Sequence, residues 1–171
     1  MLIDLSHSSN ATTEEAVEAS DAPCCCSHAF AQGKFDSPRG KPDAVLRLLA
    51  ERGGVIGLAA VPNLISHKEV QTVFDVIDHV DYLVDLVGID HVAIGTDAMF
   101  GDHVGLHKYI RGIMDMTAAL KELPASHIEY IENPGQWPNI TRALVGRRYS
   151  DDEVKKIIGG NVLRLLEETI G

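Results

Sequence analysis

Three polar residues that could bind a metal ion or move protons stand at the ends of short apolar runs. They are His7, His28 and Asp97. Histidine nitrogen is a preferred zinc ligand, and a carboxylate beside it suits either zinc binding or proton transfer. Spacing alone leaves a metal site and a purely structural role both open for these residues.

The elements that must position these residues alternate between strand and helix. We expect strands near 2–7, 24–28, 55–61 and 91–97, and helices near 12–20, 42–52 and 70–87, with two more helices after 150 and 162. Such alternation predicts βαβ units and a parallel α/β sheet. The carboxyl ends of parallel strands meet at one edge, where ligands bind. We therefore expect His7, His28 and Asp97 to face one cavity there.

Length and composition restrict the fold and the partners. The 171 residues, 45% of them hydrophobic and 23% charged, predict a single globular domain over 1–171. A complete (β/α)8 barrel needs about 250 residues, and at least roughly 200. The net charge of -10 argues against nucleic acid or an anionic membrane as the main partner. The sequence has no apolar run of the roughly 20 residues that span a bilayer, and 1–7 lacks the features of a secretory signal.

The three cysteines are contiguous, Cys24 to Cys26. This spacing matches neither a disulfide framework nor a zinc ribbon. We expect them to act as small apolar residues on a buried strand. Unpaired cysteines are typical of a reducing compartment, which predicts a cytoplasmic location.

Other motifs carry weaker signals. His103 and His107 lie four residues apart and could share a helix face, but no glutamate follows His103 as the zinc-protease helix motif requires. Ser6 and Ser27 each precede a candidate histidine, and we expect them to end strands. The other histidines have no partner at ligand spacing, and we expect surface or capping roles for them: His67, His79, His91 and His127.

Several motifs occur in one order along nearly the whole chain: Asp4-Leu5-Ser6-His7, Ser27-His28, Pro38-Arg39, Gly53-Gly54-Val55-Ile56-Gly57, Asp90-His91-Val92-x-Ile94-Gly95-Thr96-Asp97 and Gly159-Gly160-Asn161-x-x-Arg164. Together they resemble the membrane (renal-type) dipeptidases. These are zinc peptidases of the amidohydrolase superfamily with a (β/α)8 barrel. The resemblance implies that this chain is the C-terminal half of such a TIM-type barrel.

The resemblance also implies roles for four residues. His7 and His28 match the histidines that bind one of two zinc ions, and Arg39 matches the arginine that holds the carboxylate of a dipeptide substrate. Asp97 matches the aspartate that handles protons while zinc-activated water hydrolyses the peptide. The family's His-x-Asp pair and the glutamate that bridges its two metal ions have no counterpart in this sequence. After Gly95-Thr96-Asp97 this chain continues with Ala98, where the family often continues with Phe-Asp-Gly. The chain is thus expected to be incomplete for catalysis alone.

Two other interpretations stay open. The chain could be an inactive half-barrel that dimerises, or an α/β domain that binds a small molecule without metal. In a half-barrel the strands near 2–7 and 91–97 become bare edges, and neither run contains an internal lysine or proline to protect it. We therefore expect a homo-oligomer, or pairing with an N-terminal half on another chain.

Overall fold

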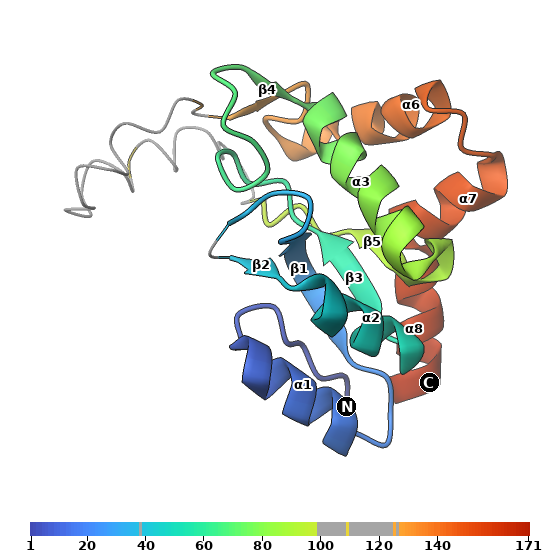
Figure 1. The fold of residues 1–171 in the computed structure, drawn as a ribbon. Coiled ribbons are helices and arrows are strands. Elements are labelled where there is room, and N and C mark those ends of the chain that lie inside the picture. Colours follow the sequence, from blue (N-terminus) through green and yellow to red (C-terminus); the bar gives the residue numbers. More distant parts are fainter. Residues whose placement is uncertain (38, 99–108, 110–124, 126) are drawn as a thin grey trace.

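The computed structural model describes residues 1–37, 39–98, 109, 125 and 127–171. Its elements alternate as predicted (Figure 1). In chain order they are α1 (Asn10–Ala19), β1 (Cys25–Ala31), β2 (Gly40–Lys41), α2 (Asp43–Glu51), β3 (Val55–Leu58), β4 (Gln71–Thr72), α3 (Val73–Val87), η1 (Ile89–His91), β5 (Val92–Ile94), β6 (Ile128–Glu129), η2 (Pro134–Gln136), α6 (Pro138–Gly146), α7 (Asp151–Lys155), η3 (Lys156–Gly160) and α8 (Asn161–Ile170).

The main sheet is parallel, with strand order β2-β1-β3-β5. The first predicted strand is shorter than expected, because only the bridge between Asp4 and Cys25 joins it to β1. Backbone bonds extend that contact, with the N–H of Leu5 donating to the carbonyl of Cys25 at 2.8 Å and the N–H of Cys25 donating to Ile3 at 2.9 Å. The segments that end at His7 and His28 are therefore neighbours, and β5 forms the opposite edge, as predicted.

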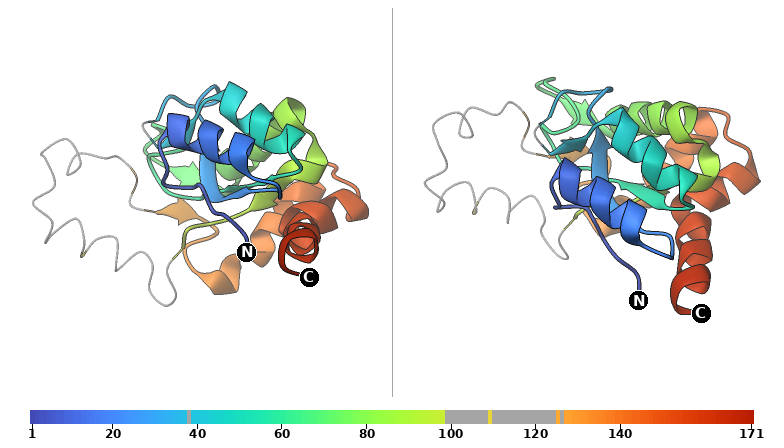
Figure 2. Two further views of the ribbon diagram at one scale, coloured as in Figure 1. Left: turned by 90° about the horizontal axis from the view of Figure 1, so that it is seen from below. Right: turned by 60° about the horizontal axis from the view of Figure 1, so that its bottom comes forward.

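Helices cover both faces of the sheet. On one face, Cys26, Ile56 and Val92 pack in the main core with the apolar sides of α2 and α3. On the other face, Cys25, Val55 and Ala93 pack against Leu165 of α8. Figures 1 and 2 show α8 beside the lower end of the sheet, close to the N-terminus. The N–H₃⁺ group of Met1 donates to the carbonyl of Thr169 at 3.3 Å, so the two termini lie side by side.

Helix boundaries follow local capping chemistry, with two corrections. The helix predicted near residue 12 begins earlier, because the Ser9 hydroxyl accepts from the N–H of Thr12 and caps α1. Pro42 is the N-cap of α2 and not its first helical residue. A capping box, in which the side chains of Ser150 and Glu153 each accept from the other's backbone N–H, begins α7, and Thr72 forms a similar capping box on α3.

The last helix is anchored to the amino ends of the strands. Asn161 is buried, and its Nδ2 donates to the carbonyls of Ile89 and Val92, both at 2.7 Å. Arg164 donates to the carbonyls of Gly53 and Asp90. The Gly-Gly-Asn-x-x-Arg motif is therefore structural, since it holds α8 at the end of the sheet away from the candidate site.

The three cysteines lie in and beside β1 with side chains at most 6% exposed, as expected for small apolar residues. All three are free thiols. Burial raises the pKa of Cys25 and Cys26 to about 12. In the described part of the chain, no helix is long and apolar enough to cross a membrane.

Candidate functional site

The two predicted histidines meet at the carboxyl edge of the sheet. Nε2 of His7 lies 2.7 Å from Nε2 of His28, and the ring centroids are 4.8 Å apart in an edge-to-face arrangement. His7 follows the short strand that pairs with β1, and His28 belongs to β1 itself. Two imidazole nitrogens that converge in this way form a pair that could bind one metal ion.

A bulge in β1 aims His28 toward the site. The register between β1 and β3 shifts between Cys26 and Ala29, so Ser27 and His28 stand out of the regular ladder. The carbonyl oxygen of Ser27 then lies close to the backbones of Gly57 and Gly95. A Cβ atom added to Gly57 or Gly95 would lie only 2.0 or 1.8 Å from that oxygen. These positions must therefore be glycine for the bulge to form.

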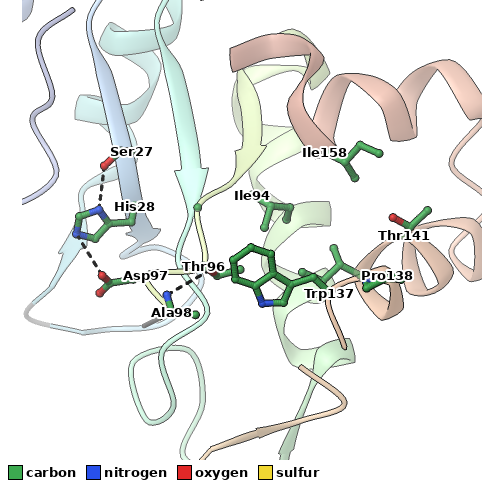
Figure 3. Close-up of a pocket in the computed structure, with 12 residues that line it drawn as sticks. Ser27, His28, Ile94, Thr96, Asp97, Ala98, Trp137, Pro138, Thr141 and Ile158 are labelled. Carbon is green, nitrogen blue, oxygen red and sulfur yellow. Dashed lines mark hydrogen bonds and ion pairs between the residues drawn. The ribbon is translucent and has the colours of Figure 1, made fainter. Parts of the chain in front are cut away.

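Asp97 completes the edge from the end of β5. Its Oδ1 lies 4.0 Å from Nε2 of His28, and its side chain is 41% exposed (Figure 3). The backbone of Asp97 has φ 57°, in the left-handed region that aspartate enters more readily than most residues. Sharp bends of this kind occur at functional sites, where they aim a side chain. Asp97 is therefore placed beside His28, as predicted.

Arg39 approaches from the loop before β2. Its Nη2 lies 3.2 Å from Nε2 of His7. Guanidinium groups only donate, so this contact requires the lone pair of the His7 nitrogen to face Arg39. Nearby, Lys41 is buried, and its Nζ donates to the carbonyl of Ser8 at 2.5 Å and to Oγ1 of Thr13 at 2.8 Å. Lys41 thus fastens the segment after His7, and burial lowers its pKa.

A carboxylate lies behind the histidines. Asp4 Oδ1 accepts from the N–H and hydroxyl of Ser6 at 3.1 and 2.6 Å and from the N–H of Ser27 at 2.9 Å. Its Oδ2 accepts from Oγ of Ser27 at 2.6 Å, and that Oγ lies 2.9 Å from Nδ1 of His28. Burial opposes ionisation, but the bonds from Ser27 and Ser6 outweigh it and lower the pKa of Asp4 to about 2.

Two cavities adjoin the site. The larger, of about 730 Å³, has Ser27, His28 and Asp97 on one side and the apolar Trp137 and Ile158 on the other (Figure 3). The smaller, of about 320 Å³, is lined by polar residues that include His7, Arg39 and Lys41. His28 and Asp97 therefore line the apolar cavity and His7 lines the basic one, so the three residues do not face a single cavity as expected.

The sequence interpretation missed several contributors. It gave Asp4 no role and treated Ser27 as a strand end, although the Asp-x-Ser spacing is typical of a side chain that accepts from the backbone two residues on. The expectation that His79 is a surface or capping residue is wrong. Its ring is 1% exposed, and Nε2 pairs with the carbonyl of Ile65 at 2.9 Å. The alternative pair His103 and His107 lies outside the described residues.

The four predicted residues fit a metal site only partly. His7 and His28 present two nitrogens of the kind that zinc prefers, and Asp97 lies close to one of them. Among the residues that the structure describes, no group of three or more His, Cys, Asp or Glu side chains is arranged to hold a metal ion. A zinc site normally takes three or four protein ligands. The donor set thus suits zinc in kind but supplies too few ligands.

Comparison with known proteins places these features in one family. The family model described as membrane dipeptidase (peptidase family M19) matches residues 1–170. The dipeptidase tcpJ of Claviceps purpurea is 31% identical over 169 residues, which are 98% of this chain and 34% of that protein. Dipeptidase 3 of Rattus norvegicus is 26% identical over 98% of this chain and 30% of its own length. The chain spans about a third of these relatives.

Solved structures share the fold. An amidohydrolase from Pseudomonas aeruginosa has a TM-score of 0.79 and 26% identity, over 98% of this chain and 52% of that one. A metallopeptidase from Rhodobacter sphaeroides, solved with a phosphinate mimic of the dipeptide L-Ala-D-Ala, has a TM-score of 0.76 and 24% identity, over 97% and 42%. These neighbours are TIM-barrel-like, which confirms the predicted half-barrel fold class. Because the family model matches residues 1–170, which is almost the whole chain, the chain belongs to the membrane dipeptidase family.

Proposed function

We propose that this chain carries the carboxyl-terminal part of a zinc-dependent dipeptidase site. The convergence of the Nε2 atoms of His7 and His28 at 2.7 Å carries the proposal. Zinc bound there would activate water for attack on an amide carbonyl near neutral pH. Family membership supports a hydrolase, and the dipeptidase names of the relatives support dipeptides as substrates.

The other two residues divide the remaining work. Arg39 has a planar guanidinium that can pair in a bidentate fashion with the free carboxylate of a dipeptide, and it lies in the basic cavity beside His7. Asp97 is close enough to His28 to reach the reacting bond and to pass a proton to the leaving amine. Substrate would therefore lie between the basic cavity and the apolar one.

We further propose that full activity needs ligands from outside this chain. The two histidines are fewer than zinc normally takes, and the relatives are about three times longer than the matched region. An N-terminal half-barrel that pairs with β5 and with the segment ending at His7 would bring further ligands to the same edge. The chain alone should bind zinc weakly and hydrolyse dipeptides slowly or not at all.

Titration calorimetry with zinc tests the metal assignment. His7→Ala should abolish the binding that the native chain shows, because one of its two nitrogen ligands is lost. His67→Ala is the matched control, since His67 contacts the ring of Phe35 and takes no part in the site. The proposal fails if His7→Ala binds zinc as the native chain does, or if the native chain binds none. Rapid release of amino acids from a dipeptide by the chain alone would refute its incompleteness.

A further inference from the structure

The hydrogen bonds behind the site have a fixed direction. Oγ of Ser27 carries one proton and has three neighbours that could accept it, Oδ2 of Asp4 at 2.6 Å, Nδ1 of His28 at 2.9 Å and Oγ of Ser6 at 3.1 Å. Asp4 is ionised at neutral pH and can only accept, so it takes the hydroxyl proton. The oxygen of Ser27 is then left as an acceptor, and Nδ1 of His28 must donate to it.

The direction of these hydrogen bonds determines whether Nε2 of His28 carries a proton. A neutral imidazole has one N–H group, so a proton on Nδ1 leaves the lone pair on Nε2. Nε2 of His28 is the atom that faces Nε2 of His7 at 2.7 Å. The lone pair of the His28 nitrogen is therefore the one that a metal ion would use.

We infer that Asp4 is a positioning residue that, through Ser27, holds His28 in the tautomer with its proton on Nδ1. This inference rests on the proposed function for its purpose, but the tautomer is a property of the chain without metal. Ser6 supports the arrangement, because its hydroxyl donates to Asp4 and accepts from the N–H of His28 at 3.1 Å. The same carboxylate therefore fixes both the ring proton and the backbone of the ligand.

Asp4→Asn should reverse the bonds while preserving the size of the side chain. Oδ1 accepts three donors and must stay an oxygen, so the amide nitrogen would occupy the Oδ2 position and donate to Ser27. The hydroxyl of Ser27 would then donate to Nδ1 of His28, and the ring proton would move to Nε2. That proton occupies the lone pair needed for zinc.

Long-range proton–nitrogen NMR of the metal-free, nitrogen-15-labelled chain reads the tautomer directly. The chain contains its own references, since Nδ1 of His91 donates to the carbonyl of Gly54 and Nε2 of His79 donates to that of Ile65. His28, assigned by the loss of its signals in His28→Gln, should match the His91 pattern in the native chain. It should move toward the His79 pattern in Asp4→Asn.

Two further variants separate positioning from folding. Ser27→Ala should lose the preference for Nδ1, and Ser27→Thr, which keeps the hydroxyl, should restore it. Asp21→Asn removes an exposed carboxylate from the segment before the amino end of β1, whereas the site lies at the carboxyl edge of the sheet, and it should change nothing. Loss of partners that orient a ligand typically weakens metal binding 10- to 100-fold, so zinc calorimetry should show a loss of about this size for Asp4→Asn.

The outcomes separate the two proposals. A native His28 with its proton on Nε2, or an Asp4→Asn variant with an unchanged His28 pattern, overturns the inference. Native-like zinc affinity in an Asp4→Asn chain whose tautomer has switched also overturns it, since the tautomer would then not matter for binding. If the native chain shows the expected tautomer but no zinc binding, the proposed function fails while the hydrogen-bond direction stands.

Discussion

At the scale of single residues, Asp4 links the site to the stability of the chain. Its two oxygens accept four hydrogen bonds from the backbone and hydroxyl groups of Ser6 and Ser27. These bonds hold its pKa at about 2, against an ordinary value of 3.8. A carboxyl whose pKa is lower in the folded chain than in the unfolded chain stabilises the fold at pH values above its pKa in the unfolded chain. This stabilisation is lost as the pH falls through the pKa of the carboxyl in the folded chain. The window therefore runs from about pH 4 down to about pH 2.

Asp4→Asn should reduce the free energy of unfolding by about 1 kcal/mol at pH 7, a value discounted because Asp4 is exposed to screening solvent. The difference between native chain and variant should shrink as the pH falls from 4 to 2, because the native carboxylate then protonates. Urea unfolding at several pH values measures both quantities. Asp21→Asn should show no such pH-dependent difference, and a pH-independent gap for Asp4→Asn would contradict this account.

At the scale of elements, apolar periodicity predicted the long helices and the way strands alternate with them along the chain. The helix near 70–87 is an example, since its apolar stripe and Gly88 mark both its face and its end. No helix is predicted over the residues of α6, which begins at Pro138 directly after the turn-rich segment of Asn133, Pro134 and Gly135. The strands β4 and β6 have two residues each, too few for any period. Short elements depend on tertiary pairing, which local patterns do not contain.

The bulge at Ser27 was equally hidden, because a register shift exists only between paired strands. Gly95→Ala tests its importance. A Cβ atom there would lie 1.8 Å from the carbonyl oxygen of Ser27, so the strand must move and His28 must move with it. We expect a loss of zinc binding, measured by calorimetry, together with destabilisation of about 1–3 kcal/mol from overpacking, measured by urea unfolding.

Gly146→Ala is the matched control for this substitution. Gly146 is the last residue of α6, and an added Cβ atom would meet nothing within 4 Å. Alanine also favours helix over glycine by roughly 1 kcal/mol in helix interiors. The control should therefore keep zinc binding and native stability. If Gly95→Ala behaves like Gly146→Ala, the bulge does not position the site.

At the scale of the whole molecule, the position of the site could be predicted because the parallel topology brings its residues to one edge of the sheet. The carboxyl ends of parallel strands share one edge, so His7, His28 and Asp97 converge there even though 90 residues of sequence separate the first from the last. Arg39 came from the family resemblance alone. The assigned roles of these four residues, the single domain over 1–171 and a cytoplasmic location all stay predictions.

The edges of the sheet predict self-association. β5 has no strand partner on its outer side among the described residues, and Ile94 lies both on that strand and in the wall of the apolar cavity. Bare parallel edges recruit other strands, so light scattering at micromolar concentration should give the mass of a homodimer. Ile94→Lys should shift the chain toward monomer, because a lysine at an edge opposes pairing.

Ile170→Lys is the control for added charge, since Ile170 is an exposed residue at the end of α8. It should leave the measured mass unchanged. A native chain that stays monomeric throughout the concentration range would refute the edge argument. Equal dissociation by both lysine variants would mean that net charge, and not the edge, controls assembly.

The cysteines of β1 also report how often β1 separates from the neighbouring strands. Burial raises the pKa of Cys25 and Cys26 to about 12, so almost none of either thiol is ionised at pH 7, and burial also keeps reagents away from both side chains. Alkylation of these residues must therefore wait until the central strand separates from its neighbours. The rate of modification of the unaltered chain would count those separations. The same strand carries His28, so each chemical event would also record a moment when the ligand pair was apart.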